Sequence, residues 1–326
     1  MKKIIHACGG CGINITATEL DLLKHQPELY GDVSVKYIDT ARADVDEYEF
    51  IDDKDVYIIT SQKEGAGGIR EALDSYISED IKTYVDTLKL KKDEIHIVIS
   101  SASGGSGSSI GPRLIHALKS LGHPVIYVMV TDTSSMFYTN TSLKTAKHIE
   151  IAGNKYGYSV PTIIIDNKES LEVVNKKVAL QVEMLTILFS GLHKSIDNTD
   201  SLLFAGNAYD KNVTGLVSVS IHTNDSISKL SDSLITTMRV LTDDRQFKVD
   251  VDILPKLNQY KIGYPNDKTI EAIKSNKLVL PLYYAITTNS SLAKLETLKN
   301  ELDKKSKITE EKKSFVSDDD DIGVDI

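Results

Sequence analysis

The sequence SASGGSGSSIG, residues 101–111, contains four glycines and five serines. The apolar stretch IHIVIS, which begins at Ile95, comes directly before it, and PRLIHALKSLG follows it from Pro112. The first pattern is typical of a buried strand and the second of a helix. A glycine-rich loop between a strand and a helix exposes backbone N–H groups beside the positive end of the helix dipole, which favours phosphate binding. The stretch therefore predicts an α/β fold with an anion site.

Similar loops occur twice more in the first half of the chain. Glycine-rich segments at 9–12, 65–68 and 104–107 each follow a short apolar stretch. Within residues 1–168 these stretches alternate with helical patterns, which predicts a parallel sheet covered by helices on both faces. Because ligands of such sheets bind outside the carboxyl ends of the strands, we expect the three loops on one rim. This expectation weakens the alternative that 101–111 is only a flexible surface loop.

The remaining sequence has a different character. The 326 residues exceed the size at which one hydrophobic core stops growing. The helical pattern of residues 169–194 is apolar around much of its circumference, which predicts a core helix buried between two layers. After this helix, alternating strand patterns favour a smaller α+β domain. The chain ends with a predicted helix whose leucines lie along one face, the leucine stripe, followed by the acidic tail SDDDDIGVDI. We expect that tail to be disordered in the free protein. The predicted segments are a parallel-sheet domain over 1–168, the core helix over 169–194, the smaller domain over 195–290, and the C-terminal helix with its tail over 291–326.

Composition limits the classes of partner. The formal charge is −9, and no basic stripe with interleaved aromatic residues occurs, so direct binding of nucleic acid is not expected. No stretch has the roughly 18 apolar residues of a membrane span, and the apolar run at the start is too short for a secretory signal. We therefore expect a cytoplasmic protein without a membrane partner.

The two cysteines, Cys8 and Cys11, have the C-x-x-C spacing of redox and metal sites. A zinc site would need two further soft ligands, and no histidine pair has ligand spacing. We therefore interpret both cysteines as small residues in a glycine loop and expect no metal bound by protein ligands alone.

Two common nucleotide-binding motifs do not match the loops. Walker A requires a Gly-Lys pair, and none occurs in the chain. The dinucleotide motif G-x-G-x-x-G fits Gly10 and Gly12, but the third glycine position is Ile15. A dinucleotide-binding oxidoreductase that uses the cysteine pair remains an alternative.

The loops resemble, in order and spacing, those of the tubulin/FtsZ superfamily. GGSGSS resembles the GGTGSG signature, with Ser106 for the threonine and Ser109 for the last glycine. GGCGIN at 9–14 resembles GGxGxN, and GAGG at 65–68, followed by Arg70, resembles the γ-phosphate loop. Within the superfamily the chain is most similar to the phage-encoded tubulins of the PhuZ type. These share the basic residue after GAGG, a shortened C-terminal domain, a long C-terminal helix and an acidic tail.

The resemblance implies a nucleotide-binding domain joined by the core helix to the smaller domain, GTP or GDP with Mg²⁺ as cofactors, and head-to-tail filaments. It implies base-reading roles for Asp166 and Asn175, and a place near the ribose and base for Asn14. The residues implied at the phosphates are Gly9, Gly10, Cys11 and Gly12, then Ala66, Gly67 and Gly68 at the γ-phosphate, and Ser103, Gly104, Gly105, Ser106, Gly107 and Ser108 around the phosphates.

The resemblance also implies a catalytic loop directly after the core helix. In the family this loop presents two acidic residues to the nucleotide of the next subunit, and SIDNTDSLL offers Asp197 and Asp200 there. Two carboxylates orient an attacking water and help to hold a cation during phosphoryl transfer. Hydrolysis would then depend on assembly. The alternative interpretation of this pair is two solvated loop residues, and Ser195 stands where the family often has asparagine.

A contact of the tail and a cellular role of the filament follow from the same resemblance. The acidic tail is expected to dock on a neighbouring subunit of the filament, with a solubilising chain end as the alternative. The filament is expected to position phage DNA or its compartment inside an infected bacterium. A GTP-binding switch or scaffold that does not polymerise is the alternative function.

Overall fold

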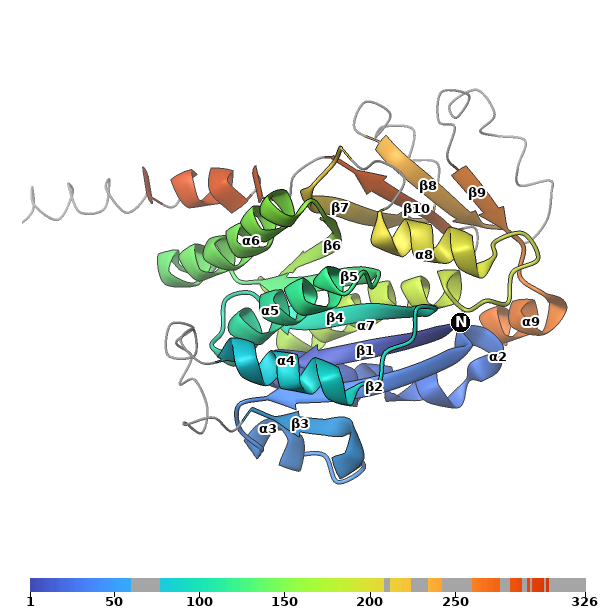
Figure 1. The fold of residues 1–326 in the computed structure, drawn as a ribbon, viewed down its shortest axis with the longest axis horizontal. Helices are drawn as coiled ribbons and strands as arrows, with labels where there is room; N and C mark the ends of the chain where they lie inside the picture. Colours follow the sequence, from blue (N-terminus) through green and yellow to red (C-terminus); the bar gives the residue numbers. More distant parts are fainter. Residues whose placement is uncertain are drawn as a thin grey trace, which may run out of the picture.

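A single sheet runs through the described part of the chain. The computed structural model describes residues 1–59, 77–207, 212–223, 234–241, 260–275, 282–288, 292–293, 295–301 and 303–304. Within these ranges the sheet has ten strands (Figure 1). Their order is β3 (Val56–Ile58), β2 (Asp32–Asp39), β1 (Lys2–Cys8), β4 (Glu94–Ser101), β5 (Val125–Thr131), β6 (Ser159–Asp166), β7 (Gly215–His222), β10 (Leu282–Thr287), β8 (Leu234–Val240) and β9 (Tyr260–Gly263).

Strand direction changes once the sheet passes β7. Every neighbouring pair from β3 to β7 is parallel, whereas β10 is antiparallel to both β7 and β8, and β9 is parallel to β8. The β6–β7 pairing covers only Ser159–Thr162 and Gly215–Ser218. These four residue pairs join the strands of the predicted smaller domain to the first sheet. The α/β fold is confirmed, and the segment boundaries stay a prediction.

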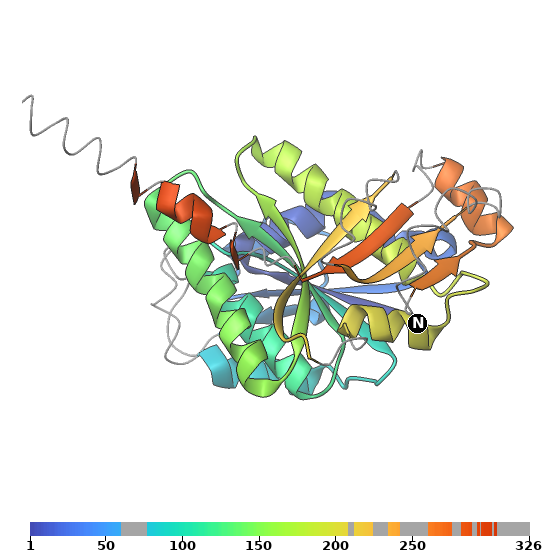
Figure 2. The same ribbon diagram turned by 90° about the horizontal axis from the view of Figure 1, so that it is seen from above.

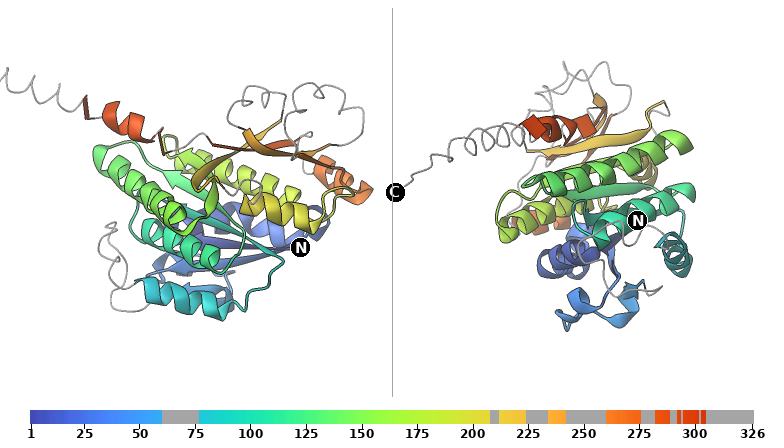
Figure 3. Two further views of the ribbon diagram at one scale, coloured as in Figure 1. Left: turned by 45° about the horizontal axis from the view of Figure 1, so that its top comes forward. Right: turned by 90° about the vertical axis from the view of Figure 1, so that its left-hand side faces the viewer.

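Helices cover both faces of the sheet. Figures 2 and 3 show α7 on the side opposite to α5 and α6. No helix among the described residues is both long and apolar enough to cross a membrane. The helical segments are α1 (Gly9–Ile15), η1 (Thr16–Leu20), η2 (Asp21–His25), α2 (Pro27–Tyr30), α3 (Ala43–Asp46), η3 (Asp53–Asp55), α4 (Ile77–Thr87), α5 (Ser106–Ser120), α6 (Met136–Tyr156), α7 (Leu171–Leu188), α8 (Asn198–Gly206) and α9 (Asp267–Ser275).

The apolar pattern of β4 explains these layers. Ile95, Ile97 and Ile99 belong to the core on the α7 side, whereas Val98 packs into the core formed with α4, α5 and α6. Successive strand residues point to opposite faces, so a strand covered on both sides is apolar almost throughout. The predicted core helix corresponds to α7, whose buried residues include Val178, Val182 and Leu185.

A polar chain of side chains crosses the buried strands β1 and β4. His6 lies 2.9 Å from Tyr84 Oη through Nδ1 and 2.9 Å from His96 Nδ1 through Nε2. Burial lowers the pKa of His6 to about 3, so its ring is neutral at physiological pH. The hydrogen bonds explain how two histidines fit into otherwise apolar strands.

Residues near the C-terminus pack on the outer side of α6. The described residues between 292 and 304 are helical, Leu295 is buried, and Leu292 packs against the same core. Lys147 of α6 pairs with Glu296 at 2.8 Å. This part of the predicted leucine stripe therefore contacts the sheet domain. The acidic tail lies outside the described residues.

Candidate functional site

The first and third glycine loops pack against each other at the carboxyl ends of β1 and β4. Gly9 has φ of +70°, and a Cβ there would lie 2.5 Å from the backbone nitrogen of Gly107. A Cβ on Gly107 would lie 3.0 Å from the carbonyl oxygen of Cys8. Because β1 and β4 are parallel neighbours, both loops start at the same rim. The backbone contact leaves no room for a side chain at Gly9.

Hydroxyl groups hold the turn before α5 in place. Ser101 Oγ accepts hydrogen bonds from the N–H groups of Ser103 at 3.2 Å and Gly104 at 3.1 Å. Ser108 Oγ donates to the carbonyl oxygen of Gly105 at 3.0 Å. The first N–H groups of an α-helix have no intrahelical acceptor, and α5 has fifteen residues to support its dipole. The predicted loop 103–108 thus presents backbone N–H groups at the start of α5, and its serine side chains mainly fix the turn.

The end of β2 adds carboxylate and hydroxyl groups that sequence reasoning missed. Thr40 Oγ1 lies 2.8 Å from Ser106 Oγ, and the Thr40 N–H donates to Asp39 Oδ1 at 2.6 Å. Asp39 is 2% exposed, and its Oδ2 has no hydrogen-bond partner among the described residues. Burial, and to a smaller extent the nearby Asp44, raise the pKa of Asp39 to about 6. A cation would stabilise the ionised carboxylate, and oxygen groups of this kind suit Mg²⁺.

Asp44 also approaches the first loop. A Cβ built on Gly10 would lie 2.5 Å from Asp44 Oδ2, the end of a side chain that can move. The available signal for Asp39, Thr40 and Asp44 was their position directly after an apolar strand, at the same edge as the glycine loops.

Two predicted amide side chains meet at the inner side of this rim. Asn175 Nδ2 donates to Asn14 Oδ1 at 2.6 Å, and Asn14 Nδ2 donates to Tyr48 Oη at 2.6 Å. Asn175 is 5% exposed, and its Oδ1 has no partner among the described residues. The structure thus connects α1 with α7 and leaves one buried amide oxygen for a ligand. Sequence reasoning did not single out Tyr48.

Asp166 lies at the end of β6 with both carboxylate oxygens close to polar groups. Thr133 Oγ1 donates to its Oδ2 at 2.6 Å, Thr131 Oγ1 lies 3.4 Å from its Oδ1, and Lys168 pairs with Oδ2 at 2.8 Å. A base read by Asp166 would therefore compete with Lys168.

Both cysteines of the first loop are free. Burial raises the pKa of the Cys11 thiol to about 12, and it raises the pKa of Cys8 further. The thiolate is the reactive and metal-binding form, so neither side chain is activated at neutral pH. This argues against the oxidoreductase alternative and leaves Cys11 to act through its backbone.

The predicted catalytic acids, Asp197 and Asp200, lie at the opposite end of the sheet. A Cβ built on Gly191 would lie 3.4 Å from the Met1 nitrogen and 3.8 Å from Asn198 Oδ1, so α8 begins beside the start of β1. Figure 1 shows α8 and the N-terminus at the same end. The seven residues of β1, at about 3.3 Å each, then separate this end from the glycine loops by roughly 20 Å.

The two acids form a capping box at the start of α8. Asp197 Oδ1 accepts the N–H of Asp200 at 2.8 Å, and Asp200 Oδ2 accepts the N–H of Asp197 at 3.3 Å. Asp200 is 8% exposed. The pair therefore has a local structural role, which sequence reasoning missed although the D-x-x-D spacing before an apolar run is a local signal for it. Asp200 is therefore not a solvated loop residue, whereas Asp197 is exposed to solvent as the N-cap of α8.

Two predicted features lie outside the described residues. Ala66, Gly67 and Gly68 belong to the interval 60–76, and the acidic tail belongs to 305–326.

The N-terminal half of the chain matches one protein family. Residues 3–175, just over half of the 326, match the GTPase domain of the Tubulin/FtsZ family. The chain is 30% identical over 209 residues to the phage tubulin-like protein of Pseudomonas phage phiKZ, covering 61% of each protein. It is 24% identical over 204 residues to the phage tubulin-like protein of Pseudomonas phage PhiPA3, covering 61% of this chain and 59% of the other. It thus matches about three fifths of the length of these relatives.

Solved structures share the fold over nearly the whole chain. A protofilament of TubZ from bacteriophage PhiKZ has a TM-score of 0.76 and 22% identity, covering 96% of this chain and 92% of that one. The PhuZ201 filament has a TM-score of 0.75 and 16% identity, covering 94% of this chain and 92% of that one. A GDP complex of the phage tubulin PhuZ has a TM-score of 0.74 and 17% identity, also covering 94% and 92%.

Proposed function

The chain belongs to the Tubulin/FtsZ family, and we propose that it is a GTPase that assembles head to tail and hydrolyses GTP between successive subunits. One observation carries this proposal: the glycine loops and the pair Asp197 and Asp200 lie at opposite ends of β1. A subunit cannot bring the acids to its own phosphates across roughly 20 Å. Stacking two copies along the strand direction places the acids of one at the rim of the other.

The rim supplies the nucleotide site. Backbone N–H groups of Gly9–Gly12 and of 103–108 hold the phosphates, with Ala66–Gly68 at the γ-phosphate. Asn14 and Asn175 form a fixed amide pair, and the free Oδ1 of Asn175 is an acceptor for guanine N–H groups. Asp166 is the second candidate reader of the base.

Mg²⁺ fits beside the phosphates at the end of β2. Asp39 offers a buried, unpartnered carboxylate oxygen, and the hydroxyls of Thr40 and Ser106 lie next to it. Bound there with the nucleotide, the cation would neutralise phosphate charge. The role of Asp39 is to hold the metal shell, and the role of Thr40 is to position Ser106.

Asp197 and Asp200 complete the site of the neighbouring subunit. Their capping box fixes both carboxylates at the start of α8, so they meet the neighbour's γ-phosphate in a preset geometry. One carboxylate orients the attacking water and accepts its proton, and the other holds the water in line. Hydrolysis then requires contact between two subunits.

Mixing two inactive variants tests this arrangement. Asp200→Ala keeps the rim. Gly104→Leu keeps the acids and fills the loop with a side chain, and its Cβ would make an ordinary contact with Ser101 Oγ at 3.6 Å. Each variant alone is expected to turn over GTP slowly. A mixture is expected to recover turnover, because GTP on Asp200→Ala subunits then faces intact acids. Phosphate release is measured against protein concentration.

Circular dichroism and GTP binding by Asp200→Ala provide the folding controls. Normal turnover by assembling Asp200→Ala protein, or a mixture no faster than its parts, would contradict the proposal.

The acidic tail is proposed to dock on a neighbouring subunit. This proposal rests on the run Asp318–Asp321 and on the resemblance to phage tubulins. Deleting 316–326 is expected to raise the critical concentration for assembly, measured by light scattering. Added salt is expected to weaken assembly of the full chain more than that of the truncated chain. Equal critical concentrations would assign the tail to solubility alone.

The capping box also favours a second candidate function. If Asp197 and Asp200 serve only to start α8, the chain is a GTP-binding switch or scaffold without polymerisation. Pelleting with GTP and with a non-hydrolysable analogue separates the two functions, since only the filament former sediments.

The cellular setting follows from the relatives, which come from Pseudomonas phages. We place the filament in the cytoplasm of an infected bacterium, where it positions phage DNA or its compartment. Imaging a fluorescent fusion together with stained phage DNA tests this role, because loss of filaments is expected to displace the DNA.

A further inference from the structure

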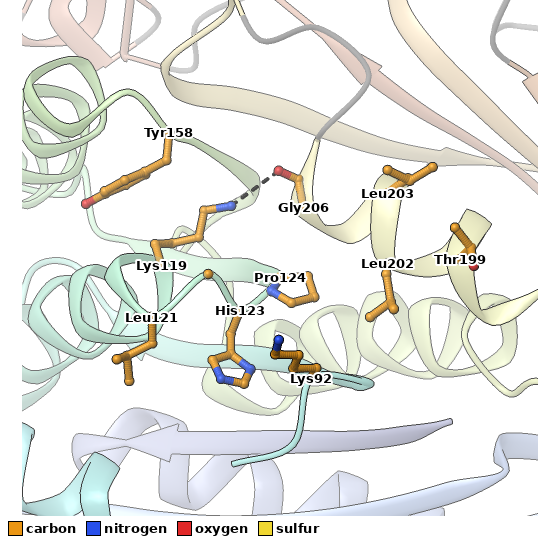
Figure 4. A pocket seen from close by; sticks show the side chains of 11 residues that line it. Lys92, Lys119, Leu121, His123, Pro124, Tyr158, Thr199, Leu202, Leu203 and Gly206 are labelled. Carbon is orange, nitrogen blue, oxygen red and sulfur yellow. Dashed lines mark hydrogen bonds between the residues drawn. The ribbon is translucent and has the colours of Figure 1, made fainter.

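A groove of about 590 Å³ opens between α8 and the loop that connects α5 to β5. Lys119 and Leu121 line one side, and Leu202 and Leu203 of α8 line the other (Figure 4). Its volume falls within the range of roughly 300–1,000 Å³ that is usual for small-molecule sites. The groove lies at the end of the sheet opposite the glycine loops, so it is separate from the nucleotide site.

The walls of the groove are largely apolar. Leu121 is 61% exposed, Pro124 closes the base of the loop, and the α8 leucines are partly exposed. An exposed leucine is unremarkable by itself. Leu121, however, lines a concave surface opposite the side chains of Leu202 and Leu203, and such a surface suits the apolar part of a ligand.

Lys119 places a cation in this apolar wall. Its Nζ donates to the carbonyl oxygen of Gly206 at 3.3 Å and lies 5.9 Å from the centre of the Tyr158 ring. Within the described part of the chain it pairs with no carboxylate. Burial lowers the pKa of Lys119 to about 8, which still leaves the ammonium mostly charged at neutral pH. Lys119 is half-buried, and a partly desolvated charge that is only partly compensated is stabilised by an incoming anion.

His123 is a second polar residue of the groove. His123 Nδ1 is buried and has no hydrogen-bond partner among the described residues. Lys92 lies beside His123 on the same side of the groove, and its side chain is exposed (Figure 4). Two lysines and an unsatisfied imidazole nitrogen therefore accompany the apolar walls.

We propose that this groove binds a small amphipathic organic acid, with the anionic group at Lys119 and the apolar body between Leu121 and the α8 leucines. The ligand would connect α8 to the α5–β5 loop. Binding requires neither GTP nor a second subunit, so it stands independently of the proposed function.

A pair of fluorescent probes tests the charge requirement. Pyrenebutyrate carries a carboxylate, and pyrenebutanol has the same aromatic body without the charge. The full chain with GDP is expected to bind one pyrenebutyrate, and about tenfold more tightly than pyrenebutanol. Lys119→Gln is expected to abolish this preference, whereas Lys82→Gln, an exposed lysine of α4, retains it.

A second pair of variants tests the location. Leu121→Asp is expected to weaken both probes, whereas Leu22→Asp, at a leucine that is 63% exposed elsewhere, leaves both unchanged. Both leucines are exposed, so these variants fold even if Lys119→Gln does not. Equal affinity for the two probes, equal losses in the two leucine variants, or no binding by the wild-type chain would overturn the proposal.

Discussion

The two ends of the parallel sheet are built differently. At the carboxyl ends, the glycine loops pack backbone against backbone, and a Cβ on Gly9 would meet Gly107 at 2.5 Å. At the amino ends, side chains dominate: Asp197 and Asp200 cap α8, and Lys119 reaches Gly206 across a groove. A phosphate site made of backbone is fixed by the fold. The two acids are instead held by a local capping box at the start of α8.

The largest effect is expected from adding a Cβ at the backbone contact between Gly9 and Gly107. Gly9→Ala places a Cβ at a φ of +70° and within 2.5 Å of Gly107 N. We expect a loss of about 3 kcal/mol or more in the free energy of unfolding, from backbone strain and overpacking together. Nucleotide binding is expected to disappear with it. Urea unfolding and GDP titration measure the two effects.

Gly104→Ala is the matched control in the third loop. A Cβ there would find its nearest neighbour, Ser101 Oγ, at 3.6 Å, which is an ordinary contact. Stability is expected to change by less than about 0.5 kcal/mol. Equal stability of the Gly9→Ala and Gly104→Ala proteins would contradict the packing described for the rim.

The next largest effect separates the two roles of Asp197. Asparagine accepts the same N-cap hydrogen bond without a charge, whereas alanine does not. Asp197→Asn is therefore expected to keep its stability, and Asp197→Ala to lose about 1 kcal/mol. If the acid is catalytic, both variants lose GTP turnover by roughly a hundredfold.

Phosphate release and urea unfolding, measured on the same protein samples, compare the two losses. Asp86→Asn, at an exposed position of α4, is the control with unchanged turnover. Turnover that follows stability instead of charge would leave Asp197 with the capping role alone.

The sequence predicted the rim better than it predicted its surroundings. The glycines of 9–12 and 104–107 stand out because steric exclusion of side chains leaves a local mark in the sequence. Asp39 and Tyr48 leave no such mark. The place of Asp39 depends on the pairing of β2 beside β1, and that of Tyr48 on its hydrogen bond with Asn14, and both are long-range contacts.

Long-range pairing also explains why the continuation of the sheet beyond β6 could not be predicted from the sequence. Four residue pairs between β6 and β7 carry the sheet across the predicted segment boundary, and no local pattern specifies them. The capping box of α8 is different, because its D-x-x-D spacing is a local signal, although the pair was interpreted only as catalytic or solvated.

A pH dependence is expected from the buried carboxylate at the rim. The pKa of Asp39 is about 6 in the folded chain and about 4 in an unfolded one. Between these values the folded chain holds a proton that the unfolded chain has lost, so this contribution to stability falls as pH rises. Asparagine does not ionise, so Asp39→Asn removes this loss of stability at higher pH. The variant is expected to match the wild type near pH 4 and to be up to about 3 kcal/mol more stable at pH 7.

Urea unfolding at several pH values measures this difference, with and without Mg²⁺ and GDP. If Asp39 faces the metal shell, Mg²⁺ with GDP stabilises the wild type more than the variant. The difference between their free energies of unfolding then becomes smaller. A difference that does not change with pH would show that Asp39 titrates normally.

The smallest expected effect concerns the amide pair between α1 and α7. Asn175→Ala removes the donor to Asn14 Oδ1 and is expected to cost about 1 kcal/mol of stability. The preference for GDP over ADP is expected to fall by about tenfold, because the base loses a fixed acceptor. Asn154→Ala, at an exposed asparagine of α6, is the control. Since the two amides act through one contact, Asn14→Ala combined with Asn175→Ala should cost less than the sum of the single variants. Strict additivity would mean that the pair does not form in solution, and the base-reading side of the rim would then rest on Asp166.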